Sequence, residues 1–220
     1  MTAIAIDGPS GAGKSTLARR IAGELGYIYV DTGAMYRSIG FFTLQNNIDT
    51  GDENAVEGIL DGIQLEIARV DGVQHMLVNG EDVTANIRTE QVSMAASKVS
   101  AYPAVRKFLL DAQRNLAVEN NIIMDGRDIG TVVLPNANVK IFLTATPQDR
   151  AKRRYDELIA RGEKADYETV LADVEKRDYN DANRAAAPLK QASDAVLVDT
   201  TGLSFEEGYA LLKKTITERL

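Results

Sequence analysis

Eight consecutive residues near the amino terminus form a candidate phosphate-binding loop. The segment Gly8-Pro-Ser-Gly-Ala-Gly-Lys-Ser15 matches the spacing G-x-x-x-x-G-K-[ST] at every fixed position. Its glycines allow backbone N–H groups to surround one phosphate, and a helix that begins there adds favourable potential. Lys14 can reach the β- and γ-phosphates, and the Ser15 hydroxyl can bind Mg²⁺. The pattern predicts a nucleoside triphosphate site made of Gly8, Pro9, Ser10, Gly11, Ala12, Gly13, Lys14, Ser15 and Thr16.

A carboxylate ends an apolar segment in the second half of the chain. Ile122-Ile-Met-Asp125 has the form of a Walker B strand, whose aspartate would hold Mg²⁺ through water. The alternative is a strand-terminal aspartate that caps the next turn. Arg127 and Asp128 follow directly, at the carboxyl edge of the expected sheet, where the sites of α/β proteins lie.

Two groups of charged residues have the spacing of helix faces. One group is spaced i, i+3, i+4 and consists of Arg150, Arg153 and Arg154. The other is spaced i, i+4, i+7 and consists of Arg177, Asp181 and Arg184. Solvated helix faces with simple salt bridges would explain either group. Beside a phosphate loop, however, arginines and an aspartate also suit a ligand that carries both phosphate and hydroxyl groups.

The chemistry that fits these residues is phosphoryl transfer between two anions. MgATP carries a charge of about −2 and a nucleoside monophosphate about −2, so fixed guanidinium groups are needed to bring them together. An acceptor phosphate oxygen is already anionic, so positioning and electrostatic stabilisation suffice without a strong general base. GTPases, motor ATPases and small-molecule kinases share the phosphate loop. No N-K-x-D stretch of the guanine-reading kind is present, which favours a kinase.

Alternating strands and helices are expected to position these residues. Short apolar segments predict strands, and periodic segments between them predict helices. The expected strands cover residues 2–7, 27–30, 122–125, 139–143 and 195–198. The expected helices cover residues 14–25, 34–45, 89–100, 103–118, 147–161, 167–186 and 205–220. Pro103 suits a first helical position, and Ser204 is the expected N-cap of the last helix.

One segment departs from this alternation. Residues 63–67 and 73–78 alternate apolar and polar side chains around Asp71-Gly72, a hairpin turn signal. The predicted fold is therefore α/β, with a five-stranded, mainly parallel sheet flanked by helices and an inserted small antiparallel β segment.

Composition excludes several classes of protein. The chain has 220 residues with a net charge of −7, which argues against a nucleic-acid partner. It has no Cys and one His, His75, which we expect to be structural or exposed, so neither a disulfide framework nor a His-based metal cluster is expected. The sequence shows no signal-peptide pattern and no bilayer-spanning run, so we expect a cytoplasmic protein with no membrane partner.

Four motifs together resemble the bacterial cytidylate kinases of the nucleoside monophosphate kinase family. They are Gly8-Pro-Ser-Gly-Ala-Gly-Lys-Ser-Thr16, Asp31-Thr-Gly-Ala-Met-Tyr-Arg37, Asp125-Gly-Arg-Asp128-Ile-Gly-Thr and Lys176-Arg-Asp-Tyr-Asn-Asp-Ala-Asn-Arg184. The last two are more specific than the phosphate loop, and the resemblance runs the whole length of the chain. It implies a monomeric enzyme that moves the γ-phosphoryl group of ATP, with Mg²⁺, onto CMP or dCMP.

The resemblance also implies roles for individual residues. The cytosine would be bound by Ser97, Arg106 and Asp128, and the ribose hydroxyls by Arg177 and Asp181. The CMP phosphate would be held by Arg37, Arg127 and Arg184, with Tyr36 nearby and Thr32 supplying a hydroxyl where some relatives have Ser. The transferring phosphoryl group would be contacted by Lys14 and by the lid residues Arg150, Arg153 and Arg154. Ser97 and Arg106 have weaker local signatures, and a place on a helix surface would also explain them.

The family further implies a division into core, monophosphate-binding domain and mobile lid. We expect the core at residues 1–36, 106–149 and 183–220, the monophosphate-binding domain with its hairpin at 37–105, and the lid at 150–182. Two alternatives remain open at this point. One is another P-loop kinase, for UMP, AMP or shikimate, and the other is a nucleotide-binding switch that transfers no phosphate to a small molecule.

Overall fold

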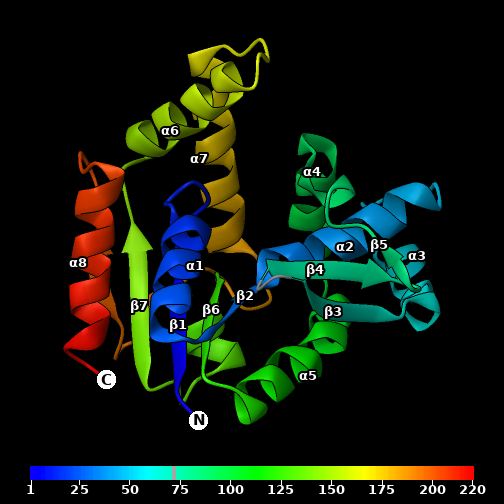
Figure 1. Ribbon diagram of the computed structural model, residues 1–220. Coiled ribbons are helices and arrows are strands. Elements are labelled where there is room, and N and C mark those ends of the chain that lie inside the picture. Colours follow the sequence, from blue (N-terminus) through cyan, green and yellow to red (C-terminus); the bar gives the residue numbers. More distant parts are fainter. Residues whose placement is uncertain (71–72) are drawn as a thin grey trace. The chain divides into compact units, whose positions relative to one another are not determined.

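The structure is a computed structural model that describes residues 1–70 and 73–220 (Figure 1). The chain divides into two compact units. We call Met1–Tyr29 with Asn120–Leu220 the sheet unit, and Val30–Glu119 the insert unit. Within the described residues, no helix has both the length and the apolar character that crossing a bilayer requires.

A five-stranded sheet in the order β2-β6-β1-β7-β8 forms the centre of the sheet unit. Its strands are β1 (Ala3–Asp7), β2 (Ile28–Asp31), β6 (Ile122–Gly126), β7 (Val139–Thr144) and β8 (Val196–Asp199). β1 pairs in parallel with β6 on one side and β7 on the other, and β7 pairs in parallel with β8. Parallel pairing brings the carboxyl ends of these strands to one edge, where β1 and β6 end at the motifs singled out above.

Two helices cover the sheet through one apolar core. They are α1 (Lys14–Leu25) and α8 (Phe205–Thr217). Leu17 and Ile21 of α1 and Leu212 and Ile216 of α8 are buried in the same cluster as the apolar residues of β1 and β7. Ser204 caps α8 in a capping box with Glu207, as its sequence predicts.

A helical pair follows β7 at its carboxyl end (Figure 1). α6 (Pro147–Ala160) and α7 (Tyr167–Asn183) pack on each other around a small core of Ala151, Val170 and Val174. The turn between them includes Gly162 with a positive φ of 76°, which ends the first helix as the sequence suggests. This pair carries five of the charged residues singled out above, namely Arg150, Arg153, Arg154, Arg177 and Asp181.

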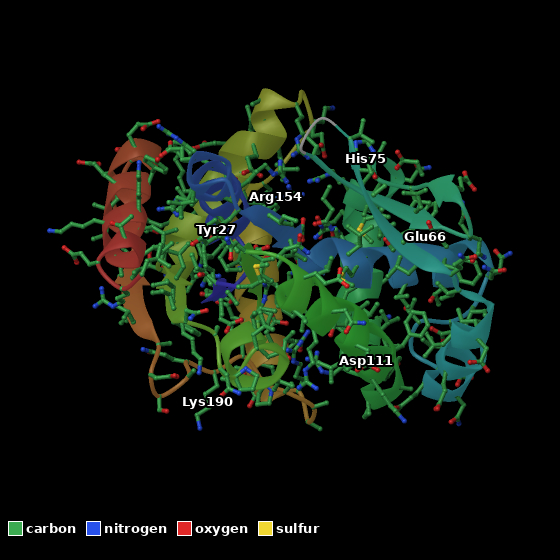
Figure 2. The ribbon with its side chains drawn as sticks, turned by 60° about the horizontal axis from the view of Figure 1, so that its bottom comes forward. Tyr27, Glu66, His75, Asp111, Arg154 and Lys190 are labelled. Carbon is green, nitrogen blue, oxygen red and sulfur yellow. The ribbon has the colours of Figure 1, made fainter. Side chains whose placement is uncertain are left out.

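The insert unit has its own helices, its own sheet and its own core. Its longer helices are α2 (Thr32–Gln45), α4 (Glu90–Val99) and α5 (Pro103–Glu119). The antiparallel sheet consists of β3 (Leu65–Val70), β4 (Val73–Val78) and β5 (Glu81–Asp82). On β4, His75 is half-buried and lies 2.7 Å from a carboxylate oxygen of Asp82 (Figure 2). This histidine has a structural partner, in keeping with the sequence expectation.

The predicted fold class, the parallel sheet and the inserted antiparallel segment are confirmed. Five short elements of the described residues have no counterpart among the sequence predictions: the helix α3 (Glu53–Gly58), the strand β5, two 3₁₀ turns at Leu60–Gly62 and Asn86–Arg88, and a π-helical turn at Ile129–Val133. The predicted turn at Asp71-Gly72 lies outside the described residues.

Candidate active site

The phosphate loop joins β1 to α1 and has the backbone that its glycines predict. Gly8 has a φ of 152°, and a Cβ built there would lie 1.9 Å from the carbonyl oxygen of Leu143. Gly13 precedes α1 in the left-handed conformation, with a φ of 86° and no side-chain cap on the helix. No side chain caps the amino-terminal N–H groups of α1, so these groups can bind an anion, as a phosphate site requires.

Lys14 is buried inside this loop. Its ammonium group donates to the carbonyl oxygen of Pro9 at 2.8 Å. Burial, followed by the nearby positive charge of Arg127, lowers the pKa of Lys14 to about 7. A bound polyphosphate would favour the charged form of this lysine, so the electrostatics suit a binding partner of high negative charge.

The two predicted metal-binding residues lie in contact. The Ser15 hydroxyl donates to Oδ2 of Asp125 at 2.8 Å, and the Tyr29 hydroxyl donates to Oδ1 of the same carboxylate at 2.9 Å. Among the described residues, no cluster of three or more His, Cys, Asp or Glu side chains is placed to hold a metal. A hydroxyl beside one carboxylate nevertheless fits Mg²⁺, which in kinases takes few protein oxygens and completes its shell with phosphates and water.

A second aspartate, Asp7, connects β1 to the turn after β6. Its two carboxylate oxygens accept hydrogen bonds from the backbone N–H groups of Ile129 and Gly130, each at 2.7 Å. Burial raises the pKa of the Asp7 carboxyl to about 6, although these two hydrogen bonds act in the opposite direction. The turn that carries Arg127 and Asp128 is thereby tied to the strand that leads into the phosphate loop.

Two arginine–carboxylate pairs occupy this edge of the sheet unit. Nε of Arg127 donates to Oδ2 of Asp181 at 2.7 Å, and Arg184 donates to Oδ1 of Asp128 at 3.1 Å. Burial opposes the ionisation of Asp181, yet Arg127 and Arg184 hold the pKa of its carboxyl below its ordinary value. The structure thus brings together four predicted site residues that are far apart in the sequence.

The prediction that Arg184 lies on a helix with Arg177 and Asp181 is wrong. α7 ends at Asn183, and Arg184 is its C-cap with an extended ψ of 141°. The Arg184 side chain donates to the carbonyl oxygen of Ala187 at 2.7 Å and to Asp128, and the N–H of Leu189 donates to the carbonyl oxygen of Asp181. These contacts turn the chain away from the helix, although the three alanines at 185–187 would favour its continuation.

Arg150 is almost wholly buried against the phosphate loop, with 2% of its surface exposed. Its guanidinium donates to both carboxylate oxygens of Asp178 on α7, at 2.9 and 2.5 Å. It also donates to the carbonyl oxygens of Ala145 and Ser10, each at 2.9 Å. Through Ser10, this arginine supports the loop from the side of the helical pair.

The other arginines of the helical pair lie closer to solvent. Arg153 donates to the carbonyl and hydroxyl oxygens of Thr200 at 2.7 and 3.3 Å, after the end of β8. Arg154, labelled in Figure 2, lies 3.6 Å from Glu157 on the same helix. Arg177 is half-buried on α7, as its predicted helix requires.

The remaining predicted site residues belong to the insert unit. Thr32, Tyr36 and Arg37 lie in the first two turns of α2, where Asp31 caps the helix and accepts from Arg37 at 3.0 Å. Nε of Arg37 is buried and makes no hydrogen bond within the described residues. The insert unit therefore holds a half-buried arginine whose buried Nε could still donate a hydrogen bond.

Ser97 on α4 and Arg106 on α5 are both half-buried. Arg106 on α5 donates to the carbonyl oxygen of Ser100 at 3.2 Å, and the Ser100 hydroxyl donates to the carbonyl oxygen of Ser97 at 3.0 Å. The guanidinium of Arg106 also lies 5.7 Å from the ring centroid of Tyr36. Two predicted substrate-binding residues, Tyr36 and Arg106, thus lie close together within the insert unit.

Sequence reasoning missed three residues of the site: Asp7, Tyr29 and Asp178. Asp7 ends an apolar strand with a carboxylate, as Asp125 does, and that shared pattern was a usable signal. Tyr29 and Asp178 reach their partners across 96 and 28 residues. Asp178 lies inside the motif of residues 176–184, but neither residue's local pattern indicates its partner.

Comparison with known proteins identifies relatives of similar length. Residues 4–218 match the family model described as cytidylate kinase. A cytidylate kinase from Carboxydothermus hydrogenoformans is 51% identical over 213 residues, covering 97% of this chain and 96% of the relative. One from Geobacillus sp. is 48% identical over 217 residues, covering 99% and 97%.

Solved structures show the same fold at low sequence identity. A shikimate kinase from Bacteroides thetaiotaomicron has a TM-score of 0.50 and 11% identity, covering 98% of both chains. An uncharacterised protein from Eubacterium ventriosum has a TM-score of 0.51 and 11% identity over the whole of both chains. The fold is that of P-loop kinases, and the family model with its near-full-length relatives shows that the chain belongs to the cytidylate kinase family.

Proposed function

We propose that the chain transfers the γ-phosphoryl group of MgATP to CMP or dCMP, giving ADP and CDP or dCDP. The observation that carries the proposal is the pair of arginine–carboxylate contacts, Arg127–Asp181 and Arg184–Asp128, at the sheet edge that also bears the phosphate loop. A triphosphate-binding loop alone would suit a switch. Arginines and carboxylates gathered beside it suit a second, anionic substrate, and the family match names cytidylate.

The donor site is the phosphate loop. The loop runs from Gly8 through Pro9 to Thr16, and the backbone N–H groups of Ser10, Gly11, Ala12, Gly13, Lys14, Ser15 and Thr16 would surround the phosphates. Lys14 would pair with the β- and γ-phosphate oxygens. Ser15 and Asp125 would hold Mg²⁺, whose chemistry is to neutralise phosphate charge. Tyr29 fixes the orientation of the Asp125 carboxylate.

In the proposed acceptor site, separate groups of residues would bind the base, the sugar and the phosphate of CMP. Asp128 would accept from the exocyclic amine of cytosine, and Ser97 and Arg106 would donate to its ring nitrogen and carbonyl. The sugar hydroxyls would contact Arg177 and Asp181. The monophosphate would be bound by Arg37, Arg127 and Arg184, with Thr32 and Tyr36 at the same end of α2. The buried Nε of Arg37, which makes no hydrogen bond within the described residues, supports this assignment because a phosphate oxygen would satisfy it.

The transfer needs no general base. A phosphate oxygen of CMP attacks the γ-phosphorus, and the bond to the β–γ bridging oxygen breaks as ADP leaves. Lys14, Arg127, Arg150, Arg153, Arg154 and Arg184 are the proposed catalytic cations. Lys14 and Arg127 would offset the charge of the transferring group. Arg150 is bound to Asp178 and to the loop, so a direct contact of Arg150 with phosphate would require these bonds to rearrange.

The proposed domains are those expected from the family, with a lid at residues 150–182 that excludes water before transfer. The separate core between α6 and α7 supports a lid that moves as one body. We further propose that the enzyme acts as a monomer in the cytoplasm, where its nucleotide substrates are made and used. Compaction with a bisubstrate analogue in small-angle scattering would test the lid.

The acceptor preference tests the function directly. Initial rates of ADP release are measured with MgATP and CMP, dCMP, UMP, AMP or shikimate. The proposal predicts fast turnover with CMP and dCMP and little with the others. Preference for UMP, AMP or shikimate would assign a different kinase activity. Slow ADP release at the same rate with and without each acceptor would favour a nucleotide-binding switch.

A further inference from the structure

Asp7 contacts both ends of the turn that carries Arg127 and Asp128. Its backbone lies opposite Gly126 in the parallel ladder between β1 and β6. Its side chain reaches over the turn and accepts from the N–H groups of Ile129 and Gly130, each at 2.7 Å. Only Arg127 and Asp128 lie between these attachment points, so their backbone is restrained on both sides.

The far side of the turn is restrained as well. The carbonyl oxygen of Asp128 accepts from the N–H groups of Val132 and Val133, at 2.9 and 3.1 Å, within the π-helical turn. Gly130 leaves no spare room, because a Cβ built there would lie 3.3 Å from Oδ2 of Asp7 and 3.2 Å from Cδ of Lys140. A close approach between carboxylate and backbone explains why a glycine occupies this position.

The ionised form of the Asp7 carboxyl is disfavoured by burial. Its carboxyl pKa is raised from 3.8 to about 6 by burial. A raised carboxyl pKa means that the native state holds the proton more tightly than the unfolded chain. The contribution of this group to stability therefore falls as the pH rises from about 4 to about 6. At neutral pH the fold retains a buried anion at a cost, as is common where a side chain positions a site.

We propose that Asp7 is a positioning residue that holds Arg127 and Asp128 in the geometry for binding the acceptor nucleotide. The inference rests on the proposed function, because it concerns the acceptor side of that site. Asp7 also directly precedes Gly8, so the competing explanation is that it shapes the phosphate loop. The two explanations differ in which substrate loses affinity when Asp7 is changed.

The test compares Asp7→Asn with two other variants. The asparagine keeps the size of the side chain but can accept only one of the two N–H groups with its oxygen. Gly130→Ala disturbs the same contact from the other side. Asp52→Asn is the matched control, because Asp52 also accepts a backbone N–H, from Ala55, but caps α3 in the insert unit.

Binding of CMP and of MgATP is measured separately by calorimetry, and melting temperature and steady-state kinetics are measured for every variant. Loss of one charge-assisted hydrogen bond predicts a roughly tenfold or greater rise in the Kd and KM for CMP in Asp7→Asn. The Kd for MgATP should change less than about threefold, and the melting temperature by only a few degrees. Gly130→Ala should show the same pattern, and the double variant should be no worse than the worse single variant.

Equal losses for CMP and MgATP would overturn the proposal and assign Asp7 to the phosphate loop. A lowered melting temperature with unchanged CMP binding would also overturn it and leave Asp7 a purely structural role. If Asp7→Asn fails to fold, Gly130→Ala carries the same comparison. A failure of the proposed function is distinguishable, because the unaltered protein would then bind no CMP.

Discussion

Replacing Asp178 by alanine should destabilise the protein through Arg150. Only 3% of the Arg150 side chain is exposed, and its guanidinium donates two hydrogen bonds to the carboxylate of Asp178. Removing one partner of a buried ion pair typically costs about 3–5 kcal/mol, because a buried charge is left uncompensated. Asp178 is 26% exposed, and the carbonyl oxygens of Ala145 and Ser10 remain as acceptors. We therefore expect Asp178→Ala to lower the free energy of unfolding by about 3 kcal/mol, the lower end of this range.

For a chain of this size, about 3 kcal/mol corresponds to a fall of roughly 6–12 °C in melting temperature. The assay is thermal unfolding followed by circular dichroism. Asp156→Ala is the matched control, because Asp156 pairs with Lys152 at 2.6 Å while more than half of each side chain is exposed. That exposed pair should contribute less than about 1 kcal/mol, so its loss should shift the melting temperature by no more than a few degrees.

A second variant separates the charge from the packing. Arg150→Met combined with Asp178→Ala removes both charges, and should regain part of the stability lost in the single variant. Equal small shifts for Asp178→Ala and Asp156→Ala would refute the reasoning. A double variant less stable than Asp178→Ala would show that the carbonyl contacts of Arg150, and not its pairing, carry the stability.

Three further changes probe the phosphate loop and the acceptor site. Gly8→Ala places a Cβ 1.9 Å from the Leu143 carbonyl oxygen, so MgATP binding should weaken by roughly tenfold or more. Calorimetry measures this binding, and an unaltered affinity would contradict the loop geometry. The pKa of Lys14 is lowered to about 7, so above that pH MgATP binding should take up a proton and should weaken as the pH rises. Calorimetry in two buffers of different ionisation enthalpy measures the proton uptake. An affinity that does not change with pH from about 7.5 to 9 would contradict the prediction. Asp128→Ala should reduce the ratio of kcat/KM for CMP over UMP by roughly tenfold with little change in MgATP affinity, and equal losses in both would count against base reading.

Local sequence patterns were sufficient for the parts of the fold that depend on local physics. The phosphate loop, the helix that begins at Lys14 and the cap at Ser204 all follow from residue types at fixed spacing. Strand and helix periodicity gave the five-stranded sheet, because buried parallel strands read as short apolar runs. The hairpin strands β3 and β4 likewise follow from alternation.

Long-range contacts decided the rest. Arg184 lies beyond the helix that its spacing suggested, since its side chain binds Asp128, 56 residues away, and the carbonyl of Ala187. The carboxylate of Asp7 meets a turn 122 residues later, and no pattern around either segment predicts that contact. The sequence also indicated that Arg150 could contact phosphate, whereas its burial against Ser10 and Asp178 emerges only from the packing of α6 on α7.

The measurement that tests the central claim most directly is the fate of the γ-phosphate. The protein is incubated with MgATP labelled at the γ-phosphate and with CMP, and the products are separated by anion-exchange chromatography. The account predicts that the label moves into CDP in proportion to the ADP formed, with little inorganic phosphate. Label recovered as inorganic phosphate, at a rate that CMP does not change, would contradict it.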